Sequence, residues 1–147
     1  MFYTHLVFSL FIALLSAKLF GIEQLYFIFI IALFGIIPDI DTHKSKVKIP
    51  ILSFILKTIF KHRGIFHSVF IPILLFFVLS YLGYYIIGLA VLLGYLSHIF
   101  LDALTPSGIR LFWPLRFKVK GFIKTNSIME KALFILLSVI TIFMIIK

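Results

Sequence analysis

The chain has 147 residues, of which 63% are hydrophobic, and it carries a formal net charge of +9. Soluble domains are roughly half apolar, so a soluble core of this size has no room for so much apolar surface. The composition therefore excludes a soluble globular domain. It predicts an all-α fold, a polytopic helical membrane protein in which residues 1–147 form a single membrane-embedded domain. The chain has no cysteine, so a bound metal would need His, Asp or Glu as ligands.

Two apolar runs occupy the N-terminal part of the chain. Residues 3–20 are mostly apolar, and a helix needs about 20 residues to cross a bilayer core. Because the first residues lack the basic segment of a signal peptide, we expect this helix to be retained. The second run, residues 25–37, is closed by Pro38, which disfavours helix in the residue before it. We therefore expect the second span to end near Ile36 and to begin as early as Ile22.

The rest of the chain alternates between apolar and polar segments. Residues 51–60 are apolar but too short to cross a bilayer, and the lysines beside them favour an interfacial helix. Residues 69–82 and 84–104 predict a third and a fourth span, and residues 132–146 a short fifth. Before the fifth span, residues 110–127 form a basic loop whose aromatic side chains suit the depth of lipid headgroups. We thus expect about five transmembrane helices plus one interfacial helix.

Lysine and arginine are distributed unevenly over this topology. With five spans, the N-terminus shares one side of the membrane with the connections after the second and fourth spans. All the cationic residues except Lys18 and Lys147 fall on that side. The positive-inside rule then places the N-terminus in the cytoplasm and the C-terminus outside the cytoplasmic membrane. The same charge predicts membrane lipids as partners and gives little reason to expect a nucleic acid.

Imidazole and carboxylate side chains gather on the same side. His98 and Asp102, near the end of the fourth span, are four residues apart and therefore share one face of a helix. Charged groups at the end of an apolar helix are costly unless they have partners. Further candidates stand at the ends of the other spans: His5, Asp39, Asp41, His62 and His67. The sequence therefore predicts that these side chains meet at the cytoplasmic side of the membrane.

Such a set of nitrogen and oxygen ligands suits zinc, manganese, iron or nickel rather than a thiolate-type zinc site. A metal held there could lower the pKa of a bound water toward ~7 and supply hydroxide for hydrolysis. A spare Asp or His could serve as general base, and Arg63 could bind a phosphate or carboxylate through two hydrogen bonds. We expect a divalent metal ion as cofactor, zinc ahead of manganese.

Each local pattern also has a simpler interpretation. His98 and Asp102 could be only a hydrogen-bonded pair at a helix end. Residues 38–41 could be a turn, and residues 62–64 a basic loop on anionic headgroups. These interpretations leave open a non-enzymatic structural or lipid-binding membrane protein. A small transporter is a third alternative, although transporter sites usually lie near the bilayer midplane, where this sequence offers no ionisable residue.

Several motifs run in order through nearly the whole chain. They are Thr4-His5, Pro38-Asp39-Ile-Asp41, His62-Arg63-Gly64-Ile-Phe-His67-Ser68, Gly94-Tyr-Leu-Ser-His98-Ile-Phe-Leu-Asp102, and Leu104-Thr-Pro-Ser-Gly108 with Phe112-Trp-Pro114. Their order and spacing resemble the YdjM-type family of predicted membrane-bound metal-dependent hydrolases. More distantly, the motif order is similar to that of the zinc-dependent phospholipase C type.

The resemblance implies a small inner-membrane protein with a metal-dependent hydrolase site. The metal ligands that it implies are His5, Asp39, His62, His67, His98 and Asp102. Asp41 and Arg63 are then the candidate catalytic residues, although Asp41 could also be a ligand. A site at headgroup depth, ringed by Lys and Arg, predicts a lipid or other amphiphile with a phosphate or ester as substrate.

Overall fold

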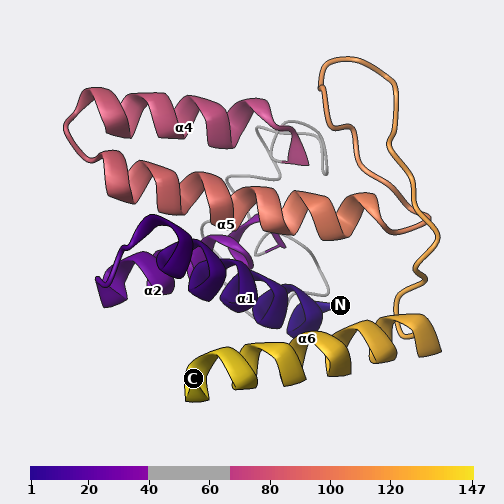
Figure 1. Ribbon diagram of the computed structural model, residues 1–147. Coiled ribbons are helices and arrows are strands. Elements are labelled where there is room, and N and C mark those ends of the chain that lie inside the picture. Colours follow the sequence, from indigo (N-terminus) through magenta and orange to yellow (C-terminus); the bar gives the residue numbers. More distant parts are fainter. Residues whose placement is uncertain (40–66) are drawn as a thin grey trace, which may run out of the picture.

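The computed structural model describes residues 1–39 and 67–147 (Figure 1). Within these two ranges the secondary structure is helical, and one isolated β-bridge is the only sheet-like pairing. The elements are α1 Phe2–Phe20, α2 Leu25–Phe34, the 3-10 helix η1 Ile37–Asp39, α4 Phe70–Tyr81, α5 Tyr85–Ala103 and α6 Ile128–Ile146. The all-α prediction is confirmed, whereas the interfacial helix expected at residues 51–60 lies outside the described residues.

Three of these helices, α1, α5 and α6, are long and apolar enough to cross a membrane, with 19 residues each. At about 1.5 Å per residue each is about 28 Å long, close to the ~30 Å thickness of a bilayer's hydrocarbon core. α2 and α4 are also apolar but have only 10 and 12 residues. A helix therefore forms in each expected region of the described chain, but the count of five spans stays a prediction.

The limits of α2 differ from the sequence-based prediction. The helix begins at Leu25 rather than Ile22, because Gly21 closes α1 in a left-handed conformation with φ 63° and a short extended turn follows. It ends at Phe34 rather than near Ile36, and the chain then passes through a turn into η1.

The start of α6 was also predicted wrongly. The helix begins at Ile128 rather than Ala132, because the Ser127 hydroxyl accepts a hydrogen bond from the Glu130 backbone N–H at 3.3 Å. The spacing Ser-x-x-Glu is the sequence signature of a helix N-terminus, and it gives α6 one further turn.

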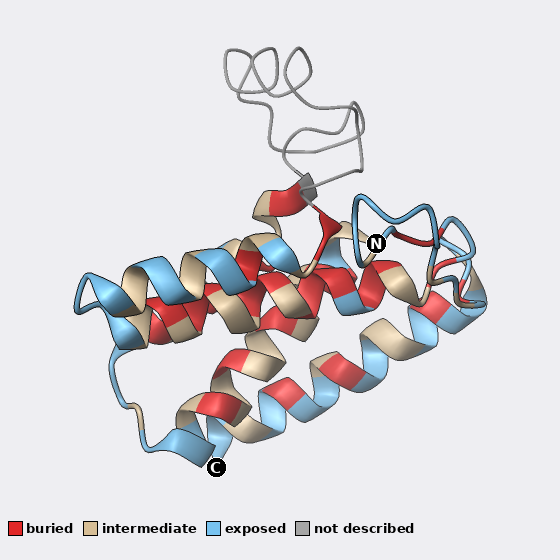
Figure 2. Ribbon diagram, turned by 90° about the horizontal axis from the view of Figure 1, so that it is seen from above, coloured by how far each residue is buried: buried red, intermediate tan, exposed pale blue. Residues whose placement is uncertain are grey.

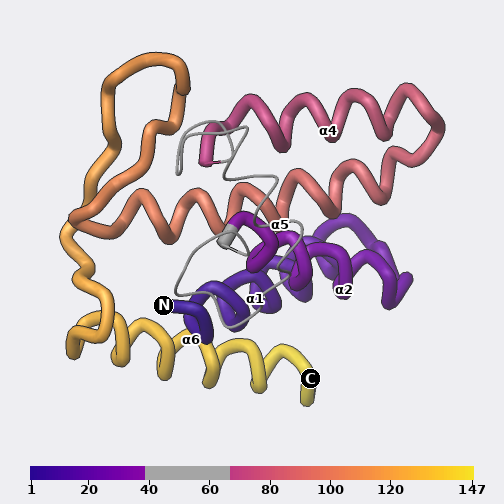
Figure 3. Tube along the Cα trace, turned by 180° about the vertical axis from the view of Figure 1, so that it is seen from behind, coloured from indigo at the N-terminus to yellow at the C-terminus, as the bar shows by residue number. Residues whose placement is uncertain are grey.

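Successive helices run in opposite directions along the bundle, so that five helix ends meet on one side (Figures 1 and 3). We call this side the polar end; it contains the starts of α1, α4 and α6 and the ends of α2 and α5. α5 packs against α1, α2 and α4, and α1 packs against α2 and α6. At the opposite end, Lys18 of α1 and Lys147 after α6 line one small cavity. Lys18 and Lys147, the two lysines predicted to lie on the side opposite the other cations, are thus close together.

Small residues let α2 approach its neighbours closely. A Cβ atom added to Gly94 of α5 would lie 2.5 Å from the Ile31 carbonyl oxygen of α2. A Cβ atom added to Gly35 would lie 2.3 Å from the Cβ atom of Ser9 in α1. Close approach at small residues is typical of helix packing in membranes, where van der Waals contact drives association. The buried core between α1, α2 and α5 consists of Ala13, Phe27, Ile31 and Ala90.

The outer surface of the bundle is apolar. α4 and α6 turn large hydrophobic side chains outward, among them Phe77 and Phe143, which are 64% and 63% exposed (Figure 2). Soluble proteins rarely expose contiguous apolar surface of this extent. Buried polar groups and an exposed apolar surface match a protein surrounded by lipid.

Candidate metal site

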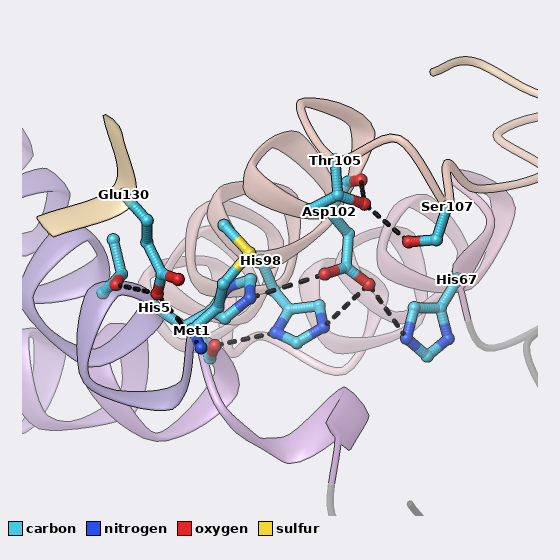
Figure 4. Close-up of polar contacts among 10 residues, drawn as sticks. Met1, His5, His67, His98, Asp102, Thr105, Ser107 and Glu130 are labelled. Atoms are coloured by element: carbon cyan, nitrogen blue, oxygen red, sulfur yellow. Dashed lines mark hydrogen bonds and ion pairs between the residues drawn. The ribbon is translucent and has the colours of Figure 1, made fainter. Parts of the chain in front are cut away.

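The Asp102 carboxylate of α5 is surrounded by three imidazole rings inside the polar end (Figure 4). Its Oδ1 atom lies 3.4 Å from Nε2 of His5, in the first turn of α1. Its Oδ2 atom lies 3.5 Å from Nε2 of His67, just before α4, and 3.8 Å from Nε2 of His98, one turn earlier in α5. We call these four residues the His–Asp cluster. It joins α1, α5 and the segment that precedes α4.

The His–Asp cluster is almost fully buried. The exposed fraction is 2% for His5, 1% for His67 and His98, and 8% for Asp102. The His5 and His98 rings are stacked with centroids 4.3 Å apart, and the His67 ring meets His98 edge-on at 5.5 Å. Burying ionisable groups in an apolar bundle is costly unless they are paired with one another or with an ion.

A hydrogen bond to the backbone fixes the tautomer of His98. Its Nδ1 atom lies 3.0 Å from the carbonyl oxygen of Gly35, at the end of α2. A carbonyl oxygen can only accept, so Nδ1 carries the proton and donates it. In the neutral ring, Nε2 then turns a lone pair toward the Asp102 carboxylate, and the two repel unless a proton or a metal ion lies between them. Metal-binding histidines commonly have this arrangement, with the other ring nitrogen held by a carbonyl.

Three donor atoms of the His–Asp cluster lie close enough together that they could hold a single divalent ion. Zinc–nitrogen bonds of ~2.0–2.1 Å in a tetrahedral site put neighbouring ligand atoms about 3.3 Å apart. His5, His98 and Asp102 each offer one donor atom, all within 4.8 Å of one another. The Nδ1 atom of His5 is also buried and has no hydrogen-bond partner among the described residues. The residues present therefore fit a divalent metal ion.

Contacts with α6 hold the first turn of α1 in place. The Thr4 hydroxyl donates a hydrogen bond of 2.8 Å to the buried Glu130 carboxylate, and the α-amino group of Met1 lies 3.1 Å from the same oxygen. The other carboxylate oxygen accepts a hydrogen bond from the Asn126 backbone N–H. Because Thr4 directly precedes His5, these contacts fix the position of His5 along the axis of the bundle.

The end of α5 is fixed in a similar way. The Thr105 hydroxyl donates a hydrogen bond of 2.8 Å to the Asp102 carbonyl oxygen and lies 2.7 Å from the Ser107 hydroxyl. Carbonyl groups in the last turn of a helix lack partners within the helix, and Thr105 supplies one here. The turn that carries Asp102 is thereby anchored to the loop that follows.

The structure brings together part of the expected site. Within the described residues, the ones that meet are His5, His67, His98 and Asp102. Asp39 lies in η1, which packs against α2 and α5, and only its backbone is described. His62, Asp41 and Arg63 lie outside the described residues, so their roles stay predictions.

Sequence reasoning gave no role to four residues that shape the site: Thr4 and Thr105, which stand in the quoted motifs, and Gly35 and Glu130. The spacing of Ser127 and Glu130 was a signal for the start of α6. No sequence signal marks the Gly35 carbonyl, because every residue has such a group and only packing decides which one reaches a histidine.

Comparison with known proteins identifies the family. A family model described as "YdjM inner membrane protein" matches residues 1–147. The chain belongs to this family. It is 36% identical over 102 residues to "Uncharacterized protein YvsG" of Bacillus subtilis, an alignment that covers 66% of this chain and 64% of that protein. It is 38% identical over 93 residues to "Inner membrane protein YdjM" of Escherichia coli, covering 58% of this chain and 47% of that protein.

The alignments thus span about half to two thirds of the length of these relatives. No solved structure matches the chain. The resemblance of the motifs to the YdjM family is confirmed, and the chain is a YdjM-family inner membrane protein.

Proposed function

We propose that this YdjM-family protein is a metal-dependent hydrolase with its site at the cytoplasmic surface of the inner membrane. One observation carries the proposal: two buried imidazoles, of His5 and His98, and the buried Asp102 carboxylate offer donor atoms within 4.8 Å of one another, and the His67 ring adjoins the same carboxylate. The His98 tautomer supports it, since a cation would relieve the repulsion between Nε2 and the carboxylate. Zinc is the first candidate because it favours nitrogen and oxygen ligands at these spacings, and manganese is the alternative.

The described residues have distinct proposed roles. His5, His98 and Asp102 would hold the ion, which would supply a bound water of lowered pKa as nucleophile. His67, beside the second carboxylate oxygen, would be a further ligand or would hold a proton there. The Gly35 carbonyl keeps His98 in the tautomer that binds metal.

The sequence-based roles of four further residues, whose side chains the structure does not describe, are kept in the proposal. Asp39 and His62 would complete the ligand set, as the family motifs imply. Asp41 would act as general base or as a ligand, and Arg63 would bind a phosphate or carboxylate of the substrate.

The substrate would be a lipid or other amphiphile with a phosphate or ester. The cluster lies at the polar end, where the long helices stop and lipid headgroups would begin. Positive charge is concentrated at the same end, in Arg110, Arg116, Lys118, Lys120, Lys124 and Lys131.

By the positive-inside rule the polar end faces the cytoplasm, with the N-terminus inside and the C-terminus outside. Alkaline phosphatase fused after Lys147 should be active, and an inactive fusion would reverse the orientation.

Bound metal tests the site. The protein is purified in mild detergent, and its metal content is measured for wild type, His98→Gln and Asp102→Asn, with Ser97→Ala as the matched control. Ser97 is buried beside His98, but among the described residues its hydroxyl donates a hydrogen bond to the Gly94 carbonyl of its own helix. We expect metal in wild type and Ser97→Ala and its loss in the other two, with helix content by circular dichroism unchanged. Equal metal content in all four proteins would contradict the proposal.

A structural role is the second candidate, because the His–Asp contacts themselves tie α1, α5 and the start of α4 together. A chelator distinguishes a metal-binding cluster from a purely structural one. If an ion is bound, chelation should lower the thermal stability of wild type and leave His98→Gln unchanged. If the cluster is only structural, chelation changes neither protein, and His98→Gln alone is less stable.

A further inference from the structure

A hairpin of residues 105–124 lies at the polar end between α5 and α6 (Figure 1). Its arms pair where Ile109 and Val119 exchange backbone hydrogen bonds of 3.0 and 2.9 Å. At its base the Gly121 N–H donates to the Thr105 carbonyl at 3.0 Å, and the Ile123 N–H donates at 2.9 Å to the carbonyl of Leu104, the residue that caps α5. We call this element the basic hairpin. These bonds hold it in a defined position on the bundle.

The outer part of the basic hairpin exposes cations and aromatic rings together. Its exposed cations are Arg110, Arg116, Lys118, Lys120 and Lys124. Its exposed large apolar side chains are Phe112, Trp113, Leu115, Phe117 and Phe122. Residues 103–129 contain no Asp or Glu, so the charge of this stretch is positive throughout. Cations next to aromatic rings are typical of segments in the headgroup region of a bilayer.

The order of residues within one arm supports the same interpretation. Residues 115–120 read Leu-Arg-Phe-Lys-Val-Lys, with apolar and basic side chains in strict alternation. In an extended arm, successive side chains point to opposite sides. The arm can therefore turn one side toward acyl chains and the other toward phosphates.

The neighbouring helices fix the depth of the hairpin. α5 ends at Ala103 and α6 begins at Ile128, and each is about as long as the hydrocarbon core is thick. The segment between them therefore has to lie at the membrane surface. There, phospholipid phosphates are the anions present at the highest density.

The basic hairpin is also connected to both sides of the His–Asp cluster. The Thr105 hydroxyl bonds to the Asp102 carbonyl, and Figure 4 shows this contact next to the cluster. The Leu111 carbonyl accepts a hydrogen bond of 3.0 Å from the N–H of Val69, two residues after His67. A headgroup on the hairpin would thus be bound close to the cluster.

We propose that the basic hairpin binds the headgroups of anionic phospholipids in the surrounding membrane and holds them beside the His–Asp cluster. Headgroup binding requires no metal and no turnover. Its use in bringing substrate to the cluster rests on the function proposed above.

Trp113 is the only tryptophan of the chain, so its fluorescence reports on the basic hairpin alone. The full chain is reconstituted in phosphatidylcholine nanodiscs with increasing fractions of phosphatidylglycerol. Quenching by lipids brominated in their acyl chains then gives the relative affinity for each headgroup. The test variant is Lys118→Gln with Lys120→Gln. The control is Lys18→Gln with Lys147→Gln, which removes the same charge from exposed lysines at the opposite end.

We expect wild type and control to prefer brominated phosphatidylglycerol, and the test variant to lose up to about thirtyfold of that preference. The preference should fall with added salt. Equal quenching by both lipids in wild type, or equal losses in both variants, would overturn the proposal. So would an oligonucleotide that shifts Trp113 emission when phosphatidylglycerol does not, since the hairpin would then bind nucleic acid. The test variant should keep its metal, so that failure here is distinct from failure of the metal site.

Discussion

α5 and α6 have the same length and are both apolar, yet their surroundings differ sharply. In the most apolar stretch of each helix, 56% of residues are buried in α5 and 17% in α6. α5 is packed by α1, α2 and α4, whereas α6 lies along α1 and turns most of its side chains outward. Hydrophobicity alone therefore does not show which helix is central. The difference lies in the small and polar residues that α5 contains.

The two helices also differ in what they bury at the polar end. α5 buries His98 and Asp102, which meet residues from two other segments. α6 buries Glu130, which meets Thr4 at the start of α1. The polar residues of α5 thus form the candidate site, and those of α6 position one of its members.

The largest expected effect is on the packing of α5. Gly94→Ala places a methyl group 2.5 Å from a backbone oxygen of α2 and 2.9 Å from the Phe34 Cβ. Because backbone atoms cannot move aside as a side chain can, we expect a loss of about 3 kcal/mol in the free energy of unfolding. Reversible unfolding in mixed micelles measures it.

The matched substitution in α6 is Ala132→Leu, which adds more atoms to an exposed position. We expect a change within about 0.5 kcal/mol, as for surface positions in general. If both variants lost similar stability, the contrast between a central and a lipid-facing helix would be wrong.

A smaller effect concerns the hydrogen bond to His98. Gly35 has φ −69°, which any residue adopts, so Gly35→Ala is limited only by Ser9, whose Cβ would be 2.3 Å away. The added methyl should push the end of α2 from α1 and move the carbonyl away from His98. Loss of such a supporting contact typically lowers metal affinity by about 10–100-fold. Titration of the metal-free protein measures this affinity.

The clash at Gly35 suggests its own control. Ser9→Gly removes both atoms that the new methyl would meet, so the double variant should recover most of the lost metal affinity. A double variant no better than Gly35→Ala would show that the Gly35 carbonyl does not act through this contact.

The contrast between α5 and α6 also shows what the sequence could predict. His98 and Asp102 were recognisable because they are ionisable, stand in an apolar helix and share one face. His5 and His67 were recognisable by their positions at helix ends. The limits of α4 and α5 were predicted to within one residue, because Gly83 and the polar residues around each apolar run mark them.

The remaining features depended on tertiary contacts. The Gly35 carbonyl is chosen by the close packing of α1, α2 and α5, which hydrophobic periodicity does not encode. Glu130 looked like a polar residue outside the site, since Thr4 and Met1, which its carboxylate contacts, lie more than a hundred residues away at the other end of the chain. The length of α2 was overestimated, because apolar composition set the expected limits and the turns on either side of the helix shorten it.

The smallest expected effect tests the role of α6 in placing His5. Thr4→Val removes the hydroxyl that bonds to Glu130 at 2.8 Å and keeps the volume of the side chain. Glu130→Ala removes the same contact from the other side, together with the bond from Asn126. A double-mutant cycle should give a coupling of about 1 kcal/mol between the two residues, typical of a hydrogen bond. Met129→Ala, at an exposed neighbour in α6, should show no coupling to Thr4→Val.

If α6 fixes the position of His5 along the bundle axis, Thr4→Val should also weaken metal binding, although Thr4 itself is no ligand. A coupling of zero would contradict a stabilising Thr4–Glu130 contact. A measurable coupling with unchanged metal affinity would show that this contact does not place His5 for metal binding.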